Sequence, residues 1–229
     1  MIGYIIIIGF FSVIGMVMSG RLKAVFAKYS NYSLRNNMSG REIAQAMLNH
    51  YGIHDVKIVP GRGALTDHYN PKTKTIALSE PVYNSRSISA AAVAAHECGH
   101  AVQDAQNYPM LQMRSNLVPI VQISAAAQQF LFMGGIFFLG MGAQSSLVLL
   151  ILTISFGITA LFALVTLPVE FDASRRALAY LDSTGMTHGA EYEGARKALW
   201  WAAMTYVVSA LGALAAFLYF LLRFMGSRD

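Results

Sequence analysis

Two histidines and a glutamate lie within five consecutive residues, His96-Glu97-Cys98-Gly99-His100. In a helix of about 3.6 residues per turn, His96 and His100 lie one turn apart on one face, so both imidazoles can bind one metal ion. Glu97 follows the first of them and can take a proton from a water at an open coordination position. This HExxH pattern predicts a zinc site that activates water for peptide-bond hydrolysis. The alternative is a chance pentapeptide on an ordinary helix.

The residues around the pentapeptide favour a buried helix. Ser89 to Val102 is rich in alanine and other small apolar residues, and only the two histidines and Glu97 interrupt it with ionisable groups. Burying three such groups without partners is costly, whereas one divalent cation satisfies them together. We therefore expect a buried helix that carries a metal site.

A catalytic zinc site needs a third protein ligand and an open position for water. The best candidate is Glu170, which follows Leu167-Pro168-Val169 at the end of a long apolar segment. An acidic residue so close to a hydrocarbon boundary is costly enough to suggest a function. The alternative is a glutamate whose side chain only reaches the aqueous interface. If Glu170 is not the ligand, Asp172 is the next candidate.

Composition predicts a membrane protein. Apolar residues make up 55% of the chain and charged residues 13%, well below the roughly 25% of a soluble domain. Ile2 to Met18 can form a retained signal-anchor span, and Ala198 to Leu222 another. Asn116 to Val169 holds no charge over 54 residues and fits two spans that fold back near Gly140 to Ser146. We expect a mainly α fold: a four-helix polytopic membrane protein with a small α+β cytosolic insertion carrying the HExxH helix.

The basic residues orient these spans. Of the 17 Lys and Arg residues, 11 lie between Arg21 and Arg114, four between Arg175 and Lys197, and two near the C-terminus. The positive-inside rule places the first two groups in the cytosol and both termini outside. We expect an integral protein of a bacterial plasma membrane whose active site faces the cytosol. The net charge of +5 then reflects topology and contact with the lipid bilayer, and gives no reason to expect a nucleic-acid partner.

These patterns divide the chain into five parts. They are the first transmembrane helix (1–20), a cytosolic metallopeptidase region (21–115), transmembrane helices two and three (116–169), a cytosolic segment with the third ligand (170–197), and the last helix with a short tail (198–229).

The cytosolic region has its own secondary structure. Ser39-Gly40-Arg41-Glu42 begins a capped amphipathic helix that ends at Gly52. Val56 to Val59 and Lys74 to Ser79 alternate like strands, and Asn70-Pro71-Lys72 has turn chemistry. A strand shortly before an HExxH helix can offer an edge to an extended substrate; equally, it can belong to a plain hairpin that covers the helix.

Two further side chains are candidates for a role. His68 could stabilise an oxyanion or bind substrate, or it could be a surface group beside a turn. Cys98 is the only cysteine, so no intrachain disulfide can form. Two positions from His96, it points away from the ligand face and is expected to pack between helices.

Three separated motifs resemble the YugP-type family of membrane zinc metallopeptidases: the pentapeptide with Ala101-Val102-Gln103, the upstream LTDHY at 65–69, and the downstream TLPVEFDAS at 166–174. The resemblance covers nearly the whole chain. The pattern Glu170 to Ala173 is also similar, more loosely, to the third-ligand motif of HtpX-type and prenyl-protein membrane proteases, which implies that Glu170 binds zinc. Those proteases usually place an aspartate four residues after that glutamate. Here the position is Ser174, which could support a ligating histidine by a weaker hydrogen bond.

The sequence therefore predicts a zinc endopeptidase with Glu97 as general base and His96, His100 and Glu170 as zinc ligands. Its substrate would be a cytosolic or membrane-proximal polypeptide, including membrane proteins. The same prediction allows membrane-protein partners or a homo-oligomer. Two alternatives stay open: a zinc-containing membrane adaptor or assembly factor that acts by binding partner membrane proteins, and a zinc hydrolase that is not a peptidase.

Overall fold

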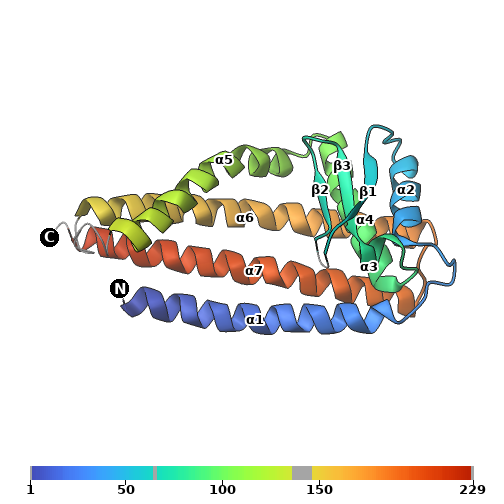
Figure 1. Ribbon diagram of the computed structural model, residues 1–229, viewed down its shortest axis with the longest axis horizontal. Helices are drawn as coiled ribbons and strands as arrows, with labels where there is room; N and C mark the ends of the chain where they lie inside the picture. The colour runs from blue at the N-terminus through green and yellow to red at the C-terminus, as the bar shows by residue number, and fades with distance from the viewer. Residues whose placement is uncertain (1, 64–65, 136–145, 228–229) are drawn as a thin grey trace. The chain divides into compact units, whose positions relative to one another are not determined.

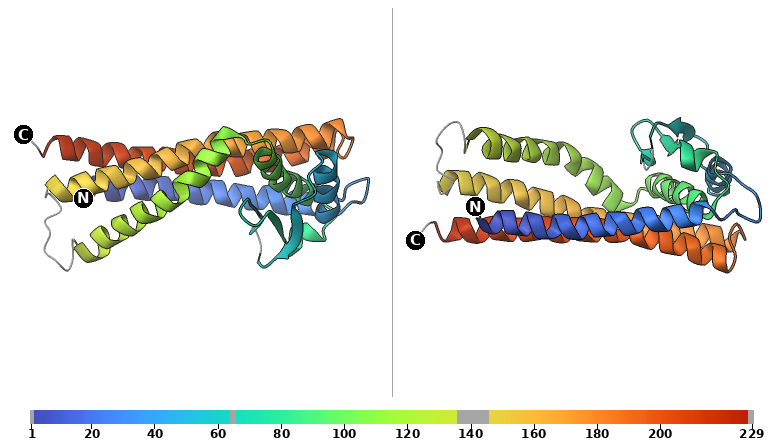
Figure 2. Two further views of the ribbon diagram at one scale, coloured as in Figure 1. Left: turned by 90° about the horizontal axis from the view of Figure 1, so that it is seen from above. Right: turned by 60° about the horizontal axis from the view of Figure 1, so that its bottom comes forward.

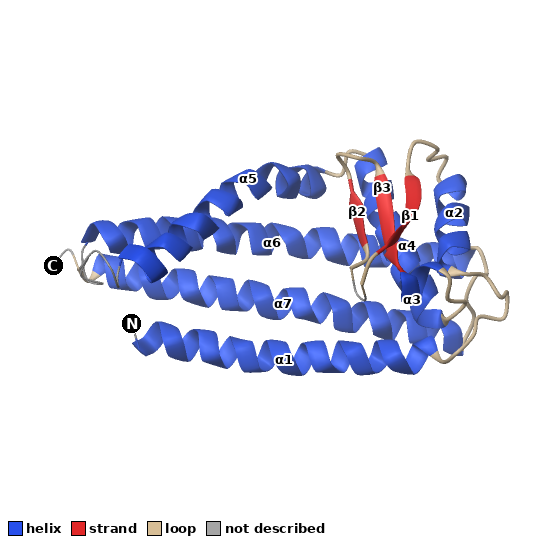
Figure 3. Cartoon of the chain, in the orientation of Figure 1, coloured by secondary structure: helices blue, strands red, loops and turns tan. Residues whose placement is uncertain are grey.

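The computed structural model of the chain describes residues 2–63, 66–135 and 146–227 (Figure 1). The predicted turn near Gly140 to Ser146 lies outside the described residues except for Ser146, as does the C-terminal Arg228-Asp229. Figure 3 shows helices throughout with a single small sheet, which confirms the mainly α class and the presence of a small α+β part.

The chain divides into two compact units. The first comprises Met1–Val17, Met113–Leu167 and Thr205–Asp229, and the second comprises Met18–Gln112 and Pro168–Met204. All the candidate catalytic and metal-binding residues belong to the second unit.

The first unit consists of apolar helical segments. They come from α1 (Ile2–Ser30), α5 (Pro109–Gln129) with the π-helical turn η1 (Phe130–Gly135), α6 (Ser146–Ser183) and α7 (Ala190–Met225). The helices α6 and α7 run side by side in both views of Figure 2. An aromatic cluster holds this unit together, with the rings of Phe156 and Phe220 stacked at 4.8 Å.

Three of the described helices are long and apolar enough to cross a membrane: α1, α6 and α7. The second of the four predicted spans corresponds to α5 and η1, which are not among them, so the count of four is not confirmed. The helix α5 carries polar residues along its length, including Arg114, Asn116 and Gln122. These residues lower the hydropathy of the part that the structure describes.

The three apolar helices continue well beyond the predicted spans. Past the ends of the predicted spans, α1 continues from Met18 to Ser30 and α6 continues from Val169 to Ser183. The helix α7 begins at Ala190, before the predicted start at Ala198. These extensions belong to the second unit, where Phe26 and Tyr29 pack against its core. The apolar run in the sequence therefore marks only the part of each helix that suits a hydrocarbon environment, because packing within the second unit stabilises the rest.

The second unit contains a three-stranded sheet in the order β1-β3-β2. The strands β1 (Lys57–Gly61) and β3 (Thr75–Ser79) were predicted, but they pair in parallel and do not form a hairpin with each other. The unpredicted strand β2 (His68–Asn70) pairs antiparallel with β3 across the predicted turn; its three residues are too few for an alternating pattern. Because β3 is central among the described strands, the strand just before the HExxH helix does not offer an edge; the edges are β1 and β2. Of the two alternatives that the sequence left open, the structure shows the hairpin, formed by β2 and β3.

Helix α4 (Ile88–Ala105), which carries the HExxH sequence, lies at the centre of the second unit. Fourteen of its 18 residues are buried, and most of those are alanine or other small residues that allow close neighbours. It contacts α2 (Gly40–His50), α3 (Glu80–Tyr83), β2 and β3. The cap predicted at Ser39 and Glu42 is present as a reciprocal capping box, and α2 ends just before Gly52, whose φ is +67°.

Candidate metal centre

The structure brings His96, His100 and Glu170 together. Glu170 Oε2 lies 3.2 Å from His96 Nε2 and 3.6 Å from His100 Nε2, and the ligand atoms of the three side chains all lie within 4.8 Å of one another. Ligands at about 2.05 Å from a tetrahedral zinc ion would be about 3.3 Å apart. The two measured N–O distances bracket that value, and two imidazoles with one carboxylate are a donor set that zinc prefers, so these residues fit the ion.

A close approach of two helix backbones allows this convergence. A Cβ atom at Gly99 would lie 2.5 Å from the backbone oxygen of Ala173 and 3.1 Å from its carbonyl carbon. No side chain fits at position 99, so α4 can come close to α6 beside Glu170. The HExxH pattern itself allows any residue there, so the pattern does not indicate a role for Gly99.

His100 is held by a buried glutamine, Gln103, which the motif patterns also do not indicate. The Nδ1 atom of His100 lies 3.0 Å from Gln103 Oε1. The amide nitrogen of Gln103 donates to the carbonyl of Val169 at 2.8 Å and to Asp172 Oδ2 at 2.9 Å. Because both donors of the amide are used on α6, its oxygen is left to accept the Nδ1 proton of His100. This arrangement makes Nε2 of His100, which is directed to Glu170, the ring nitrogen available to a metal ion.

Asp172 completes this support and is not itself a member of the metal-binding group. Its carboxylate accepts hydrogen bonds from Gln103, Arg175 and Arg176. Burial acts to raise the pKa of this carboxyl, but the hydrogen bonds outweigh it and the pKa is lowered. Asp172 lies on a different face of α6 from Glu170, as the spacing of two residues predicts. The sequence did hold one indication of a role for Gln103. It lies three residues after His100 in a buried segment, where a polar side chain must find hydrogen-bonding partners.

His96 is supported by a single hydroxyl. Ser174 Oγ lies 3.1 Å from His96 Nδ1. The hydroxyl can rotate and can donate or accept, so it constrains the imidazole less than an amide with fixed donors does. Ser174 was predicted to support one of the two ligating histidines. It lies within hydrogen-bonding distance of His96.

Glu97 is buried beside the two imidazoles, with 8% of its surface exposed. Burial raises the pKa of its carboxyl, while the neighbouring histidines oppose the shift. Burial also lowers the pKa of His100, but the hydrogen bond and charge of Glu170 outweigh it and the net pKa is raised. The site thus combines three side chains able to hold a cation with a shielded carboxyl group next to them.

The two other candidates lie in different surroundings. His68 on β2 is exposed, and its Nδ1 atom lies 2.8 Å from the carbonyl oxygen of Thr66. The structure does not group it with the three clustered side chains. Cys98 is buried, and its thiol donates to the carbonyl of Ala44 on α2 at 3.5 Å. It packs between helices, as its position in the sequence predicts.

A buried HExxH helix that meets a downstream glutamate, in a chain with three apolar helices, defines a membrane-associated site of the zinc-peptidase class. The comparisons with known proteins agree. The family model described as "Putative neutral zinc metallopeptidase" matches residues 4–225. The chain is also 41% identical over 209 residues to the "Putative membrane protease YugP" of Bacillus subtilis (strain 168), covering 91% of each chain.

The chain therefore belongs to this family of zinc metallopeptidases, and zinc is its cofactor. The membrane relative and the three apolar helices also make it a membrane-associated protein. No solved structure matches it.

Proposed function

We propose that this protein is a membrane-embedded zinc endopeptidase that hydrolyses cytosolic or membrane-proximal polypeptides. The observation that supports the proposal is the convergence of His96 and His100 from α4 with Glu170 from α6, at distances that suit a tetrahedral ion. His100 and Glu170 lie seventy residues apart in the sequence, and the fold brings together the same three side chains that the sequence motifs suggest.

Each residue has a separate task in this proposal. His96, His100 and Glu170 hold the ion, and Gln103 and Ser174 orient the two imidazoles through Nδ1. When bound, zinc supplies a Lewis acid that polarises the substrate carbonyl and makes water acidic enough to lose a proton near neutral pH. Glu97 accepts that proton and later delivers it to the departing amine nitrogen.

The substrate would approach along an edge of the sheet. In the part of the chain that the structure describes, β2 pairs only with β3, and it contacts α4. Its other edge can form backbone hydrogen bonds with an extended polypeptide. This assigns to β2 the role that the sequence suggested for the strand before the HExxH helix, and it leaves His68 as a proposed substrate contact on that strand.

Three ligands favour a hydrolase over a zinc-dependent adaptor. A structural zinc site is usually closed by four protein ligands. Among the described residues, the cluster contains three side chains able to bind the ion. The fourth position is then available for water, as hydrolysis requires. Cleavage assays on polypeptides and on other substrates separate a peptidase from a different zinc hydrolase.

The decisive variant is Glu97→Gln in the purified full-length protein. It should keep about one zinc ion per chain and lose at least about 1,000-fold in cleavage of a fluorescent casein, because it removes the proton acceptor and leaves all three ligands. Glu170→Ala is the matched control and should lose both zinc and cleavage. Cleavage by Glu97→Gln at the wild-type rate would refute the mechanism, and full zinc content in Glu170→Ala would move the third ligand elsewhere.

We also propose that the site faces the cytosol, because 15 of the 17 basic residues lie in the two segments assigned to that side. Single cysteines at Ser85, Ser145 and Ser227 in a Cys98→Ala background test this in intact cells. An impermeant maleimide should label the cysteines at 145 and 227 and spare the one at 85. The reversed pattern would place the site outside, and labelling at both 85 and 145 would refute the four-span topology.

A further inference from the structure

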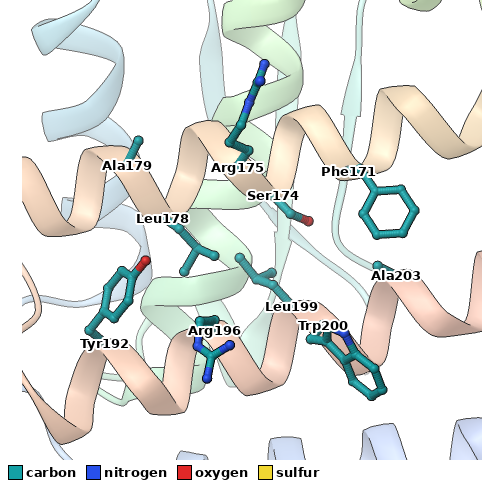
Figure 4. Close-up of a pocket in the computed structure, with 10 residues that line it drawn as sticks. All are labelled: Phe171, Ser174, Arg175, Leu178, Ala179, Tyr192, Arg196, Leu199, Trp200 and Ala203. Carbon is teal, nitrogen blue, oxygen red and sulfur yellow. The ribbon is translucent and has the colours of Figure 1, made fainter.

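A groove of about 380 Å³ lies between α6 and α7 in the second unit (Figure 4). Leu178 of α6 and Leu199 of α7 project into the space between the two helices. The groove adjoins the candidate metal centre through one residue: Ser174 lines it and also lies 3.1 Å from His96 Nδ1. The three metal-binding side chains themselves do not line it.

The groove has a polar end and an apolar end. Tyr192 and Arg196 of α7 lie towards one end, opposite the apolar Leu178 and Ala179 of α6. Phe171 of α6 lies with Trp200 and Ala203 of α7 at the other end. The helices are antiparallel, and both become uncharged in the direction of the apolar end. The part of α6 before Glu170 carries no charged residue, and neither does the part of α7 between Lys197 and Arg223. The polarity of the groove therefore follows the polarity of the membrane-spanning helices.

Both charged residues that line the groove are arginines, and none of the ten lining residues is acidic. Arg196 pairs with Glu193 at 2.7 Å, but both side chains are about half exposed. Such a surface pair is weak, because solvent screens it. The planar guanidinium can instead bind a phosphate through two parallel N–H groups.

Trp200 completes the pattern at the apolar end. Its side chain is exposed, and its ring packs edge-on against Trp201 with the centroids 4.9 Å apart. Tryptophan gathers where membrane lipids change from headgroup to acyl chain. An exposed indole beside an apolar groove, next to an arginine one turn away, matches that chemistry.

We propose that this groove binds an anionic phospholipid, with the phosphate at Arg196 and the first part of an acyl chain along Phe171, Trp200 and Ala203. A polypeptide fits less well, because the lining offers few groups that could bond a peptide backbone. Ser174 lines the same groove and also makes the hydrogen bond that orients His96, so it connects the lipid site to the metal centre. The site does not depend on proteolysis and can be tested without a substrate.

Quenching of Trp200 by brominated lipids tests the proposal. The Trp201→Phe variant leaves Trp200 as the single tryptophan of the full-length chain. In vesicles of mixed composition, brominated phosphatidylglycerol should quench it with about fivefold higher relative affinity than brominated phosphatidylcholine, the size expected for one basic residue at an anionic membrane surface. Adding Arg196→Gln should abolish the preference.

Arg223→Gln on the same helix is the matched control and should leave the preference unchanged, since Arg223 does not line this groove. Ala203→Phe should reduce quenching by both lipids, because it obstructs the apolar end. Unchanged zinc content in each variant shows that the second unit is folded. Equal quenching by the two lipids would overturn the proposal, as would a preference that survives Arg196→Gln. Protection of Trp200 by an added polypeptide and not by phosphatidylglycerol would assign the groove to protein and overturn it as well.

Discussion

The two histidines of the candidate metal centre are supported in different ways. On the His100 side, a fully buried Gln103 bonds the imidazole and is itself fixed by two acceptors on α6. On the His96 side, the partner is the rotatable hydroxyl of Ser174, which also lines the groove between α6 and α7. The side chain of His96 is also somewhat more exposed, at 13% against 9% for His100.

This difference separates two requirements of a hydrolytic metal site. One part of the ligand set must be rigid, so that the ion is held with fixed geometry, and another must stay accessible, so that water and substrate can reach it. A buried amide with all its hydrogen bonds satisfied is suited to the first task. A hydroxyl that can rotate constrains its neighbour less and suits the second.

The largest expected effect comes from a change that disturbs both sides together. Gly99→Ala places a methyl group against the backbone of Ala173 and pushes α4 away from α6. We expect zinc affinity, measured by chelator competition, to fall by about 100-fold or more, beyond the usual loss from one supporting hydrogen bond. Gly20→Ala, where the added methyl meets nothing within 4 Å, should have no such effect. Wild-type affinity in Gly99→Ala would show that the helices do not need this close approach.

A change at Gln103 should disturb the His100 side alone. Gln103→Met keeps a similar volume but removes the bonds to His100, Val169 and Asp172, so zinc affinity should fall about 10-fold to 100-fold. Gln106→Ala is the matched control, since Gln106 bonds Arg176 on α6 and not a histidine. Equal zinc affinity in Gln103→Met and the wild type would mean that the amide does not set the orientation of His100.

The smallest effect is expected on the His96 side. Ser174→Ala should weaken zinc binding by about threefold to tenfold, the value of one ordinary hydrogen bond. Ser174→Asp replaces the hydroxyl with a carboxylate, which accepts a proton from Nδ1 of His96 more strongly, and it should strengthen binding by a similar factor. Ser183→Ala, farther along α6, is the control for both. A loss in Ser174→Ala as large as in Gln103→Met would remove the difference between the two sides.

Local patterns determined much of this protein in advance. The HExxH spacing predicted α4, and the cap at Ser39 predicted α2, because both depend on contacts within one or two helical turns. The long uncharged runs predicted the apolar helices, since a hydrocarbon environment requires them. The strand β2 was not predicted, and the parallel pairing of β1 with β3 could not be, because register between strands depends on residues far apart in the sequence.

The sequence by itself determined which side chains could bind a metal ion: His96, His100 and the distant Glu170. Only the tertiary structure decided how they meet. Contact between α4 and α6 requires a missing side chain at Gly99, and a buried amide at Gln103 must satisfy partners on both helices. No periodic pattern or sequence motif reveals either requirement, because each arises from the packing of one backbone against another that lies about seventy residues away in the chain.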